Sequence, residues 1–287
     1  MTTIATPEAS SILTQSSGIA NAVSKAIAPT LPKNIEAKKS NTKDLKSGWM
    51  HALIYGETDA RKTSTAAHFD KPERTRIILT RRPEQLIPLA NENYDYLLVE
   101  SANDLRYAMQ YPEKVWPDWA LLPDRTLVLD DVTRAKDMLL EDNEVGESGR
   151  ELKDMRQVHR GAKDDMQDLL SAVLHKPMHF VCVALAQVYQ NNITREEMIT
   201  PDIPPAMNRM VTTEFEFCFY INKQKWQFLT KNETTVYQAK NDKNVLETHV
   251  RTTFAKHKLP LGQENTIKLY EPMDLRAIWE RVRNGGK

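Results

Sequence analysis

Five short runs of consecutive apolar residues most constrain the fold of this chain. They are HALIY (51–55), RIILT (76–80), YLLVE (96–100), TLVLDD (126–131) and HFVCVALA (179–186). Runs that stay apolar at successive positions are typical of strands covered on both faces in a parallel sheet. Helix-compatible segments lie between them, at 62–69, 102–111 and 151–174. This alternation predicts an α/β layered core with a mainly parallel sheet.

The pattern changes at both ends of this core. Residues 1–48 are rich in Ser, Thr, Ala and Lys and contain no aromatic residue, which predicts a flexible N-terminal arm. Within the arm, the apolar positions of IANAVSKAI (19–27) fit either a short amphipathic helix that docks on a partner or on the chain itself, or a transient helix. We expect the main domain to span 49–260 and a C-terminal helical segment to span 261–287, with its helix at 274–283.

A second group of apolar runs follows residue 190. The runs are FEFCFYI (215–221), WQFLT (226–230) and TVYQAK (235–240). Because they are closely spaced, they predict an antiparallel extension of the sheet.

Composition excludes several classes of protein. The 39 Lys and Arg residues equal the 39 Asp and Glu residues, so any nucleic-acid contact has to be local. Cys182 and Cys218 lie inside apolar runs without a nearby Cys or His, which predicts buried, reduced thiols in a cytoplasmic protein and no metal cluster. No apolar stretch approaches the length of a membrane span, and the polar N-terminus does not have the pattern of a secretion signal.

The stretch GETDARKTS (56–64) directly follows the first predicted strand and opens a predicted helix. It matches the Walker A pattern GxxxxGK[ST] except that Arg61 stands in place of the second glycine. Such a loop lies at the carboxyl end of a buried strand, where helix N–H groups attract phosphate. We expect Lys62 to reach the β- and γ-phosphates and the Thr63 hydroxyl to ligate Mg²⁺. The expected nucleotide contacts are Gly56, Glu57, Thr58, Asp59, Ala60, Arg61, Lys62, Thr63 and Ser64.

Two further polar positions follow predicted strands. RTLVLDDV ends an apolar strand in Asp130 and Asp131, as in a Walker B motif, where a carboxylate holds Mg²⁺ directly or through water. Gln187 follows the next strand and either senses the γ-phosphate or is an ordinary polar residue at a strand end. We expect Thr63 and Asp130 to hold the metal, and Lys62, Asp130, Asp131 and Gln187 to serve catalysis. The pattern favours a P-loop NTPase fold with ATP and Mg²⁺ over an α/β domain without a nucleotide.

In this order the motifs resemble those of phage-encoded ATP-binding proteins with a RecA-like core, a group that includes single-strand-annealing recombinases. The resemblance runs from about Trp49 to about Pro260. It rests on LIYGETDARKTSTAAHF, YLLVESANDLRYAM, RTLVLDDVTRA, DLLSAVLHKPMHFVCVALAQ, PDIPPAMNRMVTTEFEFCFYI and YQAKNDKNVLETHV. It implies a RecA-like protein that binds ATP at the subunit interface of a ring or filament and acts in DNA recombination or annealing.

The resemblance also implies that single-stranded DNA binds the loop at 188–210, with Arg195 and Arg209 as phosphate contacts. Three acidic residues of that loop offset the arginines, so a contact with a partner protein or another subunit explains it equally well. Lys240 and Lys243 act across an interface on a neighbour's phosphates, or are solvated turn lysines.

The loop departs from the family pattern in its charged residues. Arg61 occupies a point where the backbone runs close to the phosphates, so its side chain either points outward or contacts phosphate itself. Glu57 and Asp59 place negative charge in a loop meant for an anion, which weakens binding unless both side chains turn to solvent.

The expected catalytic base is also displaced. RecA-like ATPases carry a Glu after the strand that follows the phosphate-loop helix, whereas this chain has Thr80-Arg81-Arg82 there, with Glu84 further on. Glu100 and Asp131 are the substitute candidates. Two functions therefore stay open: an ATP-binding, weakly hydrolysing DNA recombination protein, and a degenerate P-loop domain that serves assembly through its N-terminal arm. A small-molecule kinase is less favoured, because no arginine-rich lid segment is evident, although the charged stretch at 141–165 is a candidate for one.

Overall fold

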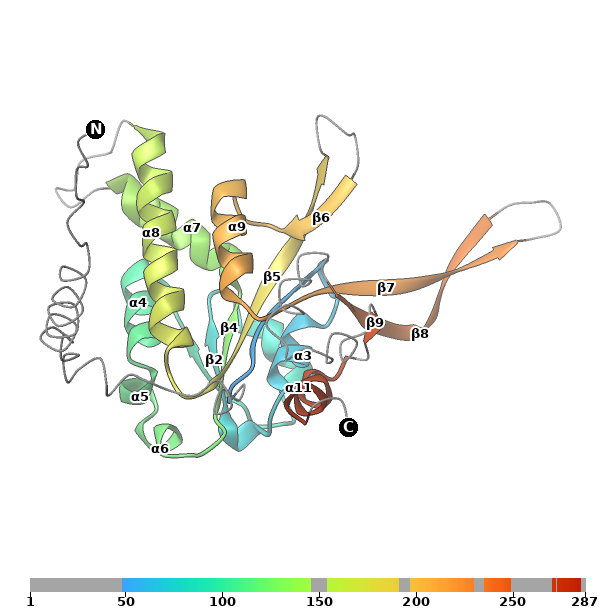
Figure 1. Ribbon diagram of the computed structural model, residues 1–287, viewed down its shortest axis with the longest axis horizontal. Coiled ribbons are helices and arrows are strands. Elements are labelled where there is room, and N and C mark those ends of the chain that lie inside the picture. The colour runs from blue at the N-terminus through green and yellow to red at the C-terminus, as the bar shows by residue number, and fades with distance from the viewer. Residues whose placement is uncertain are drawn as a thin grey trace, which may run out of the picture. The chain divides into compact units, whose positions relative to one another are not determined.

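The computed structural model describes residues 48–145, 154–190, 197–229, 235–248, 270–271 and 273–284. These residues form an α/β fold around one mixed sheet (Figure 1). The strands are β1 (His51–Gly56), β2 (Thr75–Leu79), β3 (Asp95–Leu98), β4 (Thr126–Asp130), β5 (His179–Gln190), β6 (Glu197–Pro201), β7 (Phe217–Leu229), β8 (Thr235–Thr248) and β9 (Tyr270–Glu271). Their order is β3-β2-β4-β5-β1-β7-β8-β9, with β6 paired to β5.

The sheet is parallel where it forms the core. Every neighbouring pair from β3 to β7 is parallel, whereas β7/β8, β8/β9 and β5/β6 are antiparallel. β1 lies inside the sheet, with Ala52 paired to Val181 on β5 and to Phe217 on β7. The predicted class, α/β with a mainly parallel sheet and an antiparallel C-terminal extension, is confirmed.

Helices cover both faces of the core sheet (Figure 1). The α-helices are α3 (Lys62–Ala67), α4 (Ala102–Gln110), α5 (Pro112–Val115), α6 (Pro117–Ala120), α7 (Val132–Val145), α8 (Met155–Leu174), α9 (Pro205–Glu214) and α11 (Leu275–Arg283), and the 3₁₀ helices are η2 (Pro72–Arg74) and η3 (Pro83–Leu89). Apolar residues of α4, α7, α8 and α9 pack on one face, and those of α3, η3 and α11 pack on the other. Along β1, Leu53 and Tyr55 face the first layer while Ala52 and Ile54 face the second. Burial on both faces explains why the strand sequences are apolar without alternation.

The direction of β7 corrects one prediction. The run at 215–221, expected to be antiparallel, pairs in parallel with β1 from Phe217 to Ile221. The run at 226–229 continues the same strand, and this later part pairs antiparallel with β8. The antiparallel extension therefore begins within β7, after it leaves the core sheet.

The described part of 188–210 is not the loop that the sequence predicted. It contains the end of β5, the strand β6 and the start of α9, whereas 191–196 lie outside the described residues. Helix α7 was missed as well, because no helix was predicted between Asp131 and residue 151. The predicted helix at 151–174 is present as α8 from Met155 onward.

The predicted helix at 274–283 is present as α11 and packs on the core. Its residues Ile278 and Trp279 are buried in the same cluster as Ile54 and Phe69, and the ring centroids of Phe69 and Trp279 lie 6.3 Å apart. Residues 1–47, which hold almost all of the predicted arm, lie outside the described residues. The predicted domain boundaries stay predictions.

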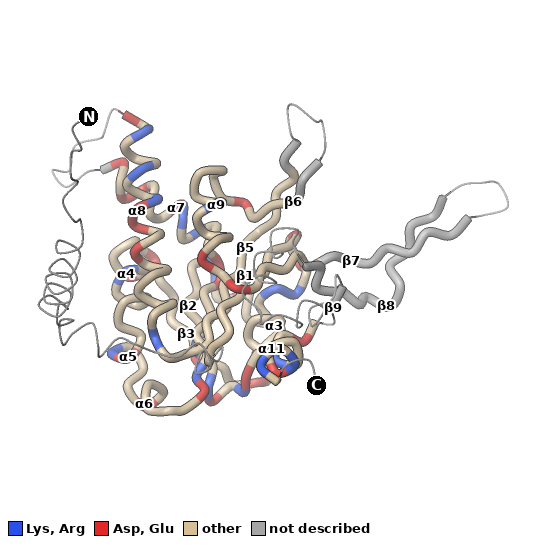
Figure 2. Tube along the Cα trace, viewed as in Figure 1, with Lys and Arg blue, Asp and Glu red and all other residues tan. Residues whose placement is uncertain are grey.

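The structure also bears on the expected charge distribution, the two cysteines and the membrane. Figure 2 shows acidic and basic residues mixed along α8, as the equal totals of charge suggest. Cys182 and Cys218 are both buried, and burial raises the pKa of the Cys182 thiol. Among the described helices, none is long and apolar enough to span a membrane.

Candidate functional site

The polar residues predicted as a site meet at one edge of the parallel sheet. Gly56 at the end of β1 pairs with Leu185 of β5, Asp130 at the end of β4 pairs with Val183 of β5, and Leu79 of β2 pairs with Asp130. Because the strands are parallel, their carboxyl ends lie together. The loop after β1, the end of β4 and the end of β2 therefore converge.

The loop after β1 is tightly packed where it begins. A Cβ on Gly56 would lie 3.2 Å from the Cβ of Ile221 and 3.3 Å from that of Ala60, so only glycine fits there without a shift of its neighbours. Glu57 and Asp59 are exposed to solvent, which satisfies the condition under which their charges leave an anion site usable.

Arg61 has the backbone conformation that favours glycine. Its φ of 63° and ψ of 28° lie in the left-handed region, and it is the N-cap of α3. Its carbonyl accepts hydrogen bonds from the Thr65 amide at 2.9 Å and the Thr65 hydroxyl at 2.8 Å, while its side chain is exposed. The chain therefore keeps a glycine-type turn at the position where the Walker A pattern has glycine, although the residue is arginine.

Lys62 is buried beneath this loop, with 8% of its surface exposed. Its Nζ donates a hydrogen bond to the Glu57 carbonyl at 2.6 Å. Burial lowers the pKa of Lys62, and the carboxylates of Asp130 and Asp131 partly oppose that shift. The loop thus wraps around an ammonium group whose hydrogen bond to a backbone carbonyl a phosphate oxygen can replace.

Thr63 and Asp130, the two predicted metal ligands, are in contact. The Thr63 hydroxyl donates to Oδ2 of Asp130 at 2.5 Å. Asp130 is 3% exposed, and its burial raises its pKa to about 6 despite the Thr63 hydrogen bond, which lowers it. Within the described part of the chain no three His, Cys, Asp or Glu residues are grouped to hold a metal. This pair suits Mg²⁺ bound to a nucleotide, because that ion takes one or two protein oxygens and fills its shell with phosphate and water.

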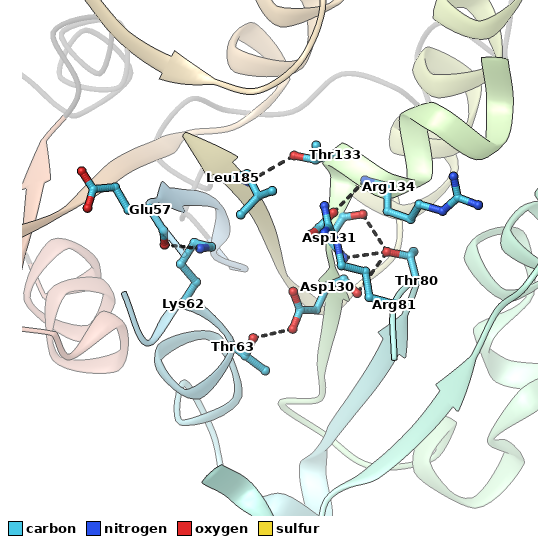
Figure 3. A network of polar contacts seen from close by, with 10 residues as sticks. All are labelled: Glu57, Lys62, Thr63, Thr80, Arg81, Asp130, Asp131, Thr133, Arg134 and Leu185. Carbon is cyan, nitrogen blue, oxygen red and sulfur yellow. Dashed lines mark hydrogen bonds and ion pairs between the residues drawn. The ribbon is translucent and has the colours of Figure 1, made fainter. Parts of the chain in front are cut away.

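Asp131 holds other parts of the site in place (Figure 3). Its Oδ1 accepts from the Arg134 amide at 2.7 Å and so caps the start of α7, and its Oδ2 lies 2.7 Å from Arg81 Nε in an ion pair. The Thr80 hydroxyl accepts from the Asp131 amide at 2.9 Å and donates to the Asp131 carbonyl at 3.0 Å. Burial raises the pKa of Asp131. Both of its carboxylate oxygens are engaged in positioning α7 and Arg81.

The other predicted functional residues lie outside this group. Gln187 Nε2 donates to the carbonyls of Pro201 and Ile203, both at 3.2 Å, and so ties β5 to the segment between β6 and α9. Its role as a γ-phosphate sensor stays a prediction. Arg209 is exposed on α9, Arg195 is not among the described residues, and Lys240 and Lys243 belong to β8, where only the backbone is described.

The displaced Glu84 and the substitute candidate Glu100 both lie away from Asp130. Glu84 is exposed in η3, and Glu100 is exposed just beyond β3, which β2 separates from the strand of Asp130. Arg81, Thr80 and Thr133 also belong to this region, although no motif indicated a role for them. The Thr133 hydroxyl accepts from the Leu185 amide at 3.1 Å and links α7 to β5. The only sequence signal for the first two was their position directly after a predicted strand.

Comparison with known proteins gives little further guidance. No family model matches the chain, and no curated protein matches it. Among solved structures, 126 chains match; one is an ATPase from the type III secretion system of pathogenic bacteria, 12% identical, with a TM-score of 0.42. That match covers 61% of this chain and 51% of the ATPase, so this chain spans about half its length. At that identity and score the likeness carries no argument about function.

The two motifs and the order of the strands define the fold. A Walker A-type loop follows β1, a Walker B-type carboxylate ends β4, and β5 lies between these two strands in a parallel sheet covered on both faces. This is an α/β fold of the RecA-like P-loop NTPase kind.

Proposed function

We propose that this chain binds ATP with Mg²⁺ in the loop that follows β1 and hydrolyses it slowly. The observation that carries the proposal is the 2.5 Å contact between Thr63 and Asp130 beside the buried Lys62. A buried carboxylate whose pKa is raised to about 6 is costly for a fold to maintain, and such groups cluster at functional sites.

Each residue has a separate part in binding. Lys62 exchanges the Glu57 carbonyl for oxygens of the β- and γ-phosphates, with which an ammonium makes strong, charge-assisted hydrogen bonds. Thr63 and Asp130 hold the Mg²⁺, which neutralises phosphate charge when bound. The acidic side chains of Glu57 and Asp59 stay in solvent and repel the phosphates only weakly.

Slow hydrolysis is inferred from the end of β2. Thr80 is engaged with the backbone of Asp130 and Asp131, and Arg81 stands where a water-orienting glutamate is expected. Of the two substitute carboxylates, Asp131 caps α7 and pairs with Arg81, and Glu100 lies beyond the edge strand. Neither is placed to orient an attacking water.

Calorimetric titration of the full chain with ATP and Mg²⁺ tests the proposal. Replacing Lys62 with Ala should weaken ATP binding by about 10- to 100-fold, the loss expected for a charged hydrogen-bond donor. Lys71→Ala, an exposed lysine at the start of η2, is the matched control and should bind as the unchanged chain does. The proposal is wrong if the unchanged chain does not bind ATP, or if Lys62→Ala binds it equally well.

As a finer proposal, this ATP binding serves recombination or annealing of single-stranded DNA in an oligomer. The motif order shared with RecA-like phage proteins and the exposed Arg209 on α9 support it. The mixed surface charge limits DNA contacts to a local site. Filter binding of an oligonucleotide at low salt should show retention that ATP changes; no retention with or without ATP refutes this finer function.

A second candidate is a structural or assembly role with little ATPase activity. The ion pair of Arg81 with Asp131, in place of a catalytic carboxylate, favours it. In that case Lys62→Ala leaves the biological function intact. Deletion of residues 1–48 abolishes assembly, which size-exclusion chromatography with light scattering measures as a loss of oligomer. If instead Lys62→Ala abolishes function, the second candidate is excluded.

A further inference from the structure

Arg81, just beyond the end of β2, is positioned by Thr80 and Asp131. Its backbone follows Thr80, whose amide donates to the Asp130 carbonyl at 2.8 Å and whose hydroxyl is hydrogen-bonded to Asp131. Its Nε lies 2.7 Å from Asp131 Oδ2, and its side chain is 31% exposed while that of Asp131 is 5% exposed. The guanidinium is therefore anchored on its buried side and open to solvent on the other.

The anchored guanidinium lies on the far side of Asp130 from the phosphate loop. Figure 3 shows Asp130 between Lys62 on one side and the pair of Arg81 and Asp131 on the other. The charge of Arg81 acts on both inner groups, since it contributes to lowering the pKa of Lys62 and opposes the rise in the pKa of Asp130. The Mg²⁺-binding carboxylate thus has a cation on each side.

Most donors of this guanidinium are unused. Arginine has five N–H groups in a planar fork, and the ion pair with Asp131 is recorded at Nε. Within the described residues, neither terminal nitrogen of Arg81 donates a hydrogen bond to the protein. A guanidinium that keeps one edge on a carboxylate can present its other edge to two phosphate oxygens, which an ammonium cannot do.

We propose that Arg81 binds the terminal phosphate of the nucleotide and makes the site select ATP over ADP. This inference depends on the proposed ATP binding. In a Walker A loop the backbone holds the inner phosphates and the lysine reaches the outer ones, so the γ-phosphate lies farthest from the loop. Arg81 lies across Asp130 from Lys62, so on this proposal it approaches the γ-phosphate from the side opposite the lysine. Asp131 acts as a positioning residue, because it fixes the guanidinium without contacting the nucleotide.

Calorimetric titration of the full chain with Mg²⁺ and either ADP or the non-hydrolysable β,γ-imido analogue of ATP tests this inference. In Arg81→Ala, the dissociation constant of the triphosphate analogue should rise about 10- to 100-fold, while that of ADP changes less than about threefold. Arg82→Ala is the matched control, because Arg82 is the next residue and is exposed. This variant should keep the unchanged chain's preference for the triphosphate over ADP. If the role of Arg81 is purely structural, the substitution should weaken the binding of both nucleotides equally.

Arg81→Lys is the alternative test if Arg81→Ala does not fold. Lysine keeps the charge but cannot hold Asp131 and a phosphate together, so triphosphate binding should still weaken about tenfold. If either variant folds and keeps the unchanged chain's ratio of ADP to triphosphate affinity, the inference is overturned while ATP binding stands. If the unchanged chain binds neither nucleotide, both the inference and the proposed function are overturned.

Discussion

Replacing Arg61 with glycine should stabilise the protein. Arg61 has φ 63° and ψ 28°, a left-handed conformation in which the Cβ of an L-residue is crowded by its own backbone. Its side chain is exposed and takes part in no hydrogen bond or ion pair with the described residues. The substitution therefore removes backbone strain without removing a contact.

The size of the effect follows from two opposing terms. Left-handed backbone costs a residue with a Cβ about 1–2 kcal/mol. Glycine loses about 0.5–1 kcal/mol more conformational freedom on folding than other residues do. The difference gives Arg61→Gly a net gain of about 0.5–1 kcal/mol in the free energy of unfolding, or a rise in Tm of about 1–4 °C for a domain of this size.

Urea unfolding followed by circular dichroism measures this gain as a shift of the midpoint at constant slope. Arg82→Gly is the matched control: Arg82 is also exposed, but its φ of −67° is ordinary, so the same change should destabilise by about 0.5–1 kcal/mol. Opposite signs for the two substitutions are the expected result. If Arg61→Gly destabilises the protein as much as Arg82→Gly does, the strain argument is wrong.

Two other substitutions test the buried parts of the site. Burial raises the pKa of Asp130 from 3.8 to about 6, so the folded state holds the proton more tightly than the unfolded state does. The stability that this proton contributes is fully present below pH 4 and is lost as the pH rises through 6. Without nucleotide, the free energy of unfolding of Asp130→Asn relative to that of the unchanged chain should therefore rise by up to about 3 kcal/mol between pH 4 and pH 8. Urea unfolding at each pH measures this difference, and a difference that stays constant with pH would contradict the prediction. Gly56→Ala should lose about 1–3 kcal/mol because its Cβ would crowd Ile221 and Ala60, and an unchanged midpoint would count against that packing.

The parts of the fold that were predictable are those with a local signal. The buried positions of β1 and β4 are apolar except Thr126 and Asp130; the phosphate loop directly follows β1, and the Asp130 carboxylate ends β4. Parallel strands bring such strand ends together whatever the intervening sequence, so the Thr63–Asp130 contact followed from the predicted topology.

Other features depend on partners that the local sequence does not reveal. β7 is parallel to β1 and then antiparallel to β8, and a single apolar run is compatible with either direction. The ion pair of Arg81 with Asp131 joins the ends of two strands far apart in the chain. Only its geometry shows that an arginine occupies the place expected for a catalytic carboxylate.

Two of the missed helices did have a signal. α9 begins with Pro205 at its first position, where proline is favoured, but the segment was expected to belong to the loop that the resemblance implies. α7 begins after Asp131, whose carboxylate caps the Arg134 amide, a role hidden because Asp131 was assigned to catalysis.

The packing of α11 has a consequence for the order in which the chain folds during synthesis. Ile54 of β1 and Phe69, just after the phosphate-loop helix, share their apolar cluster with Ile278 and Trp279. A ribosome makes these last two residues after every described strand of the sheet. Until they emerge, the face that supports the nucleotide loop has no complete cover, and the nascent chain exposes apolar surface that favours aggregation. The apolar cover of the earliest-made strand of the described fold is thus completed only when its last-made helix emerges.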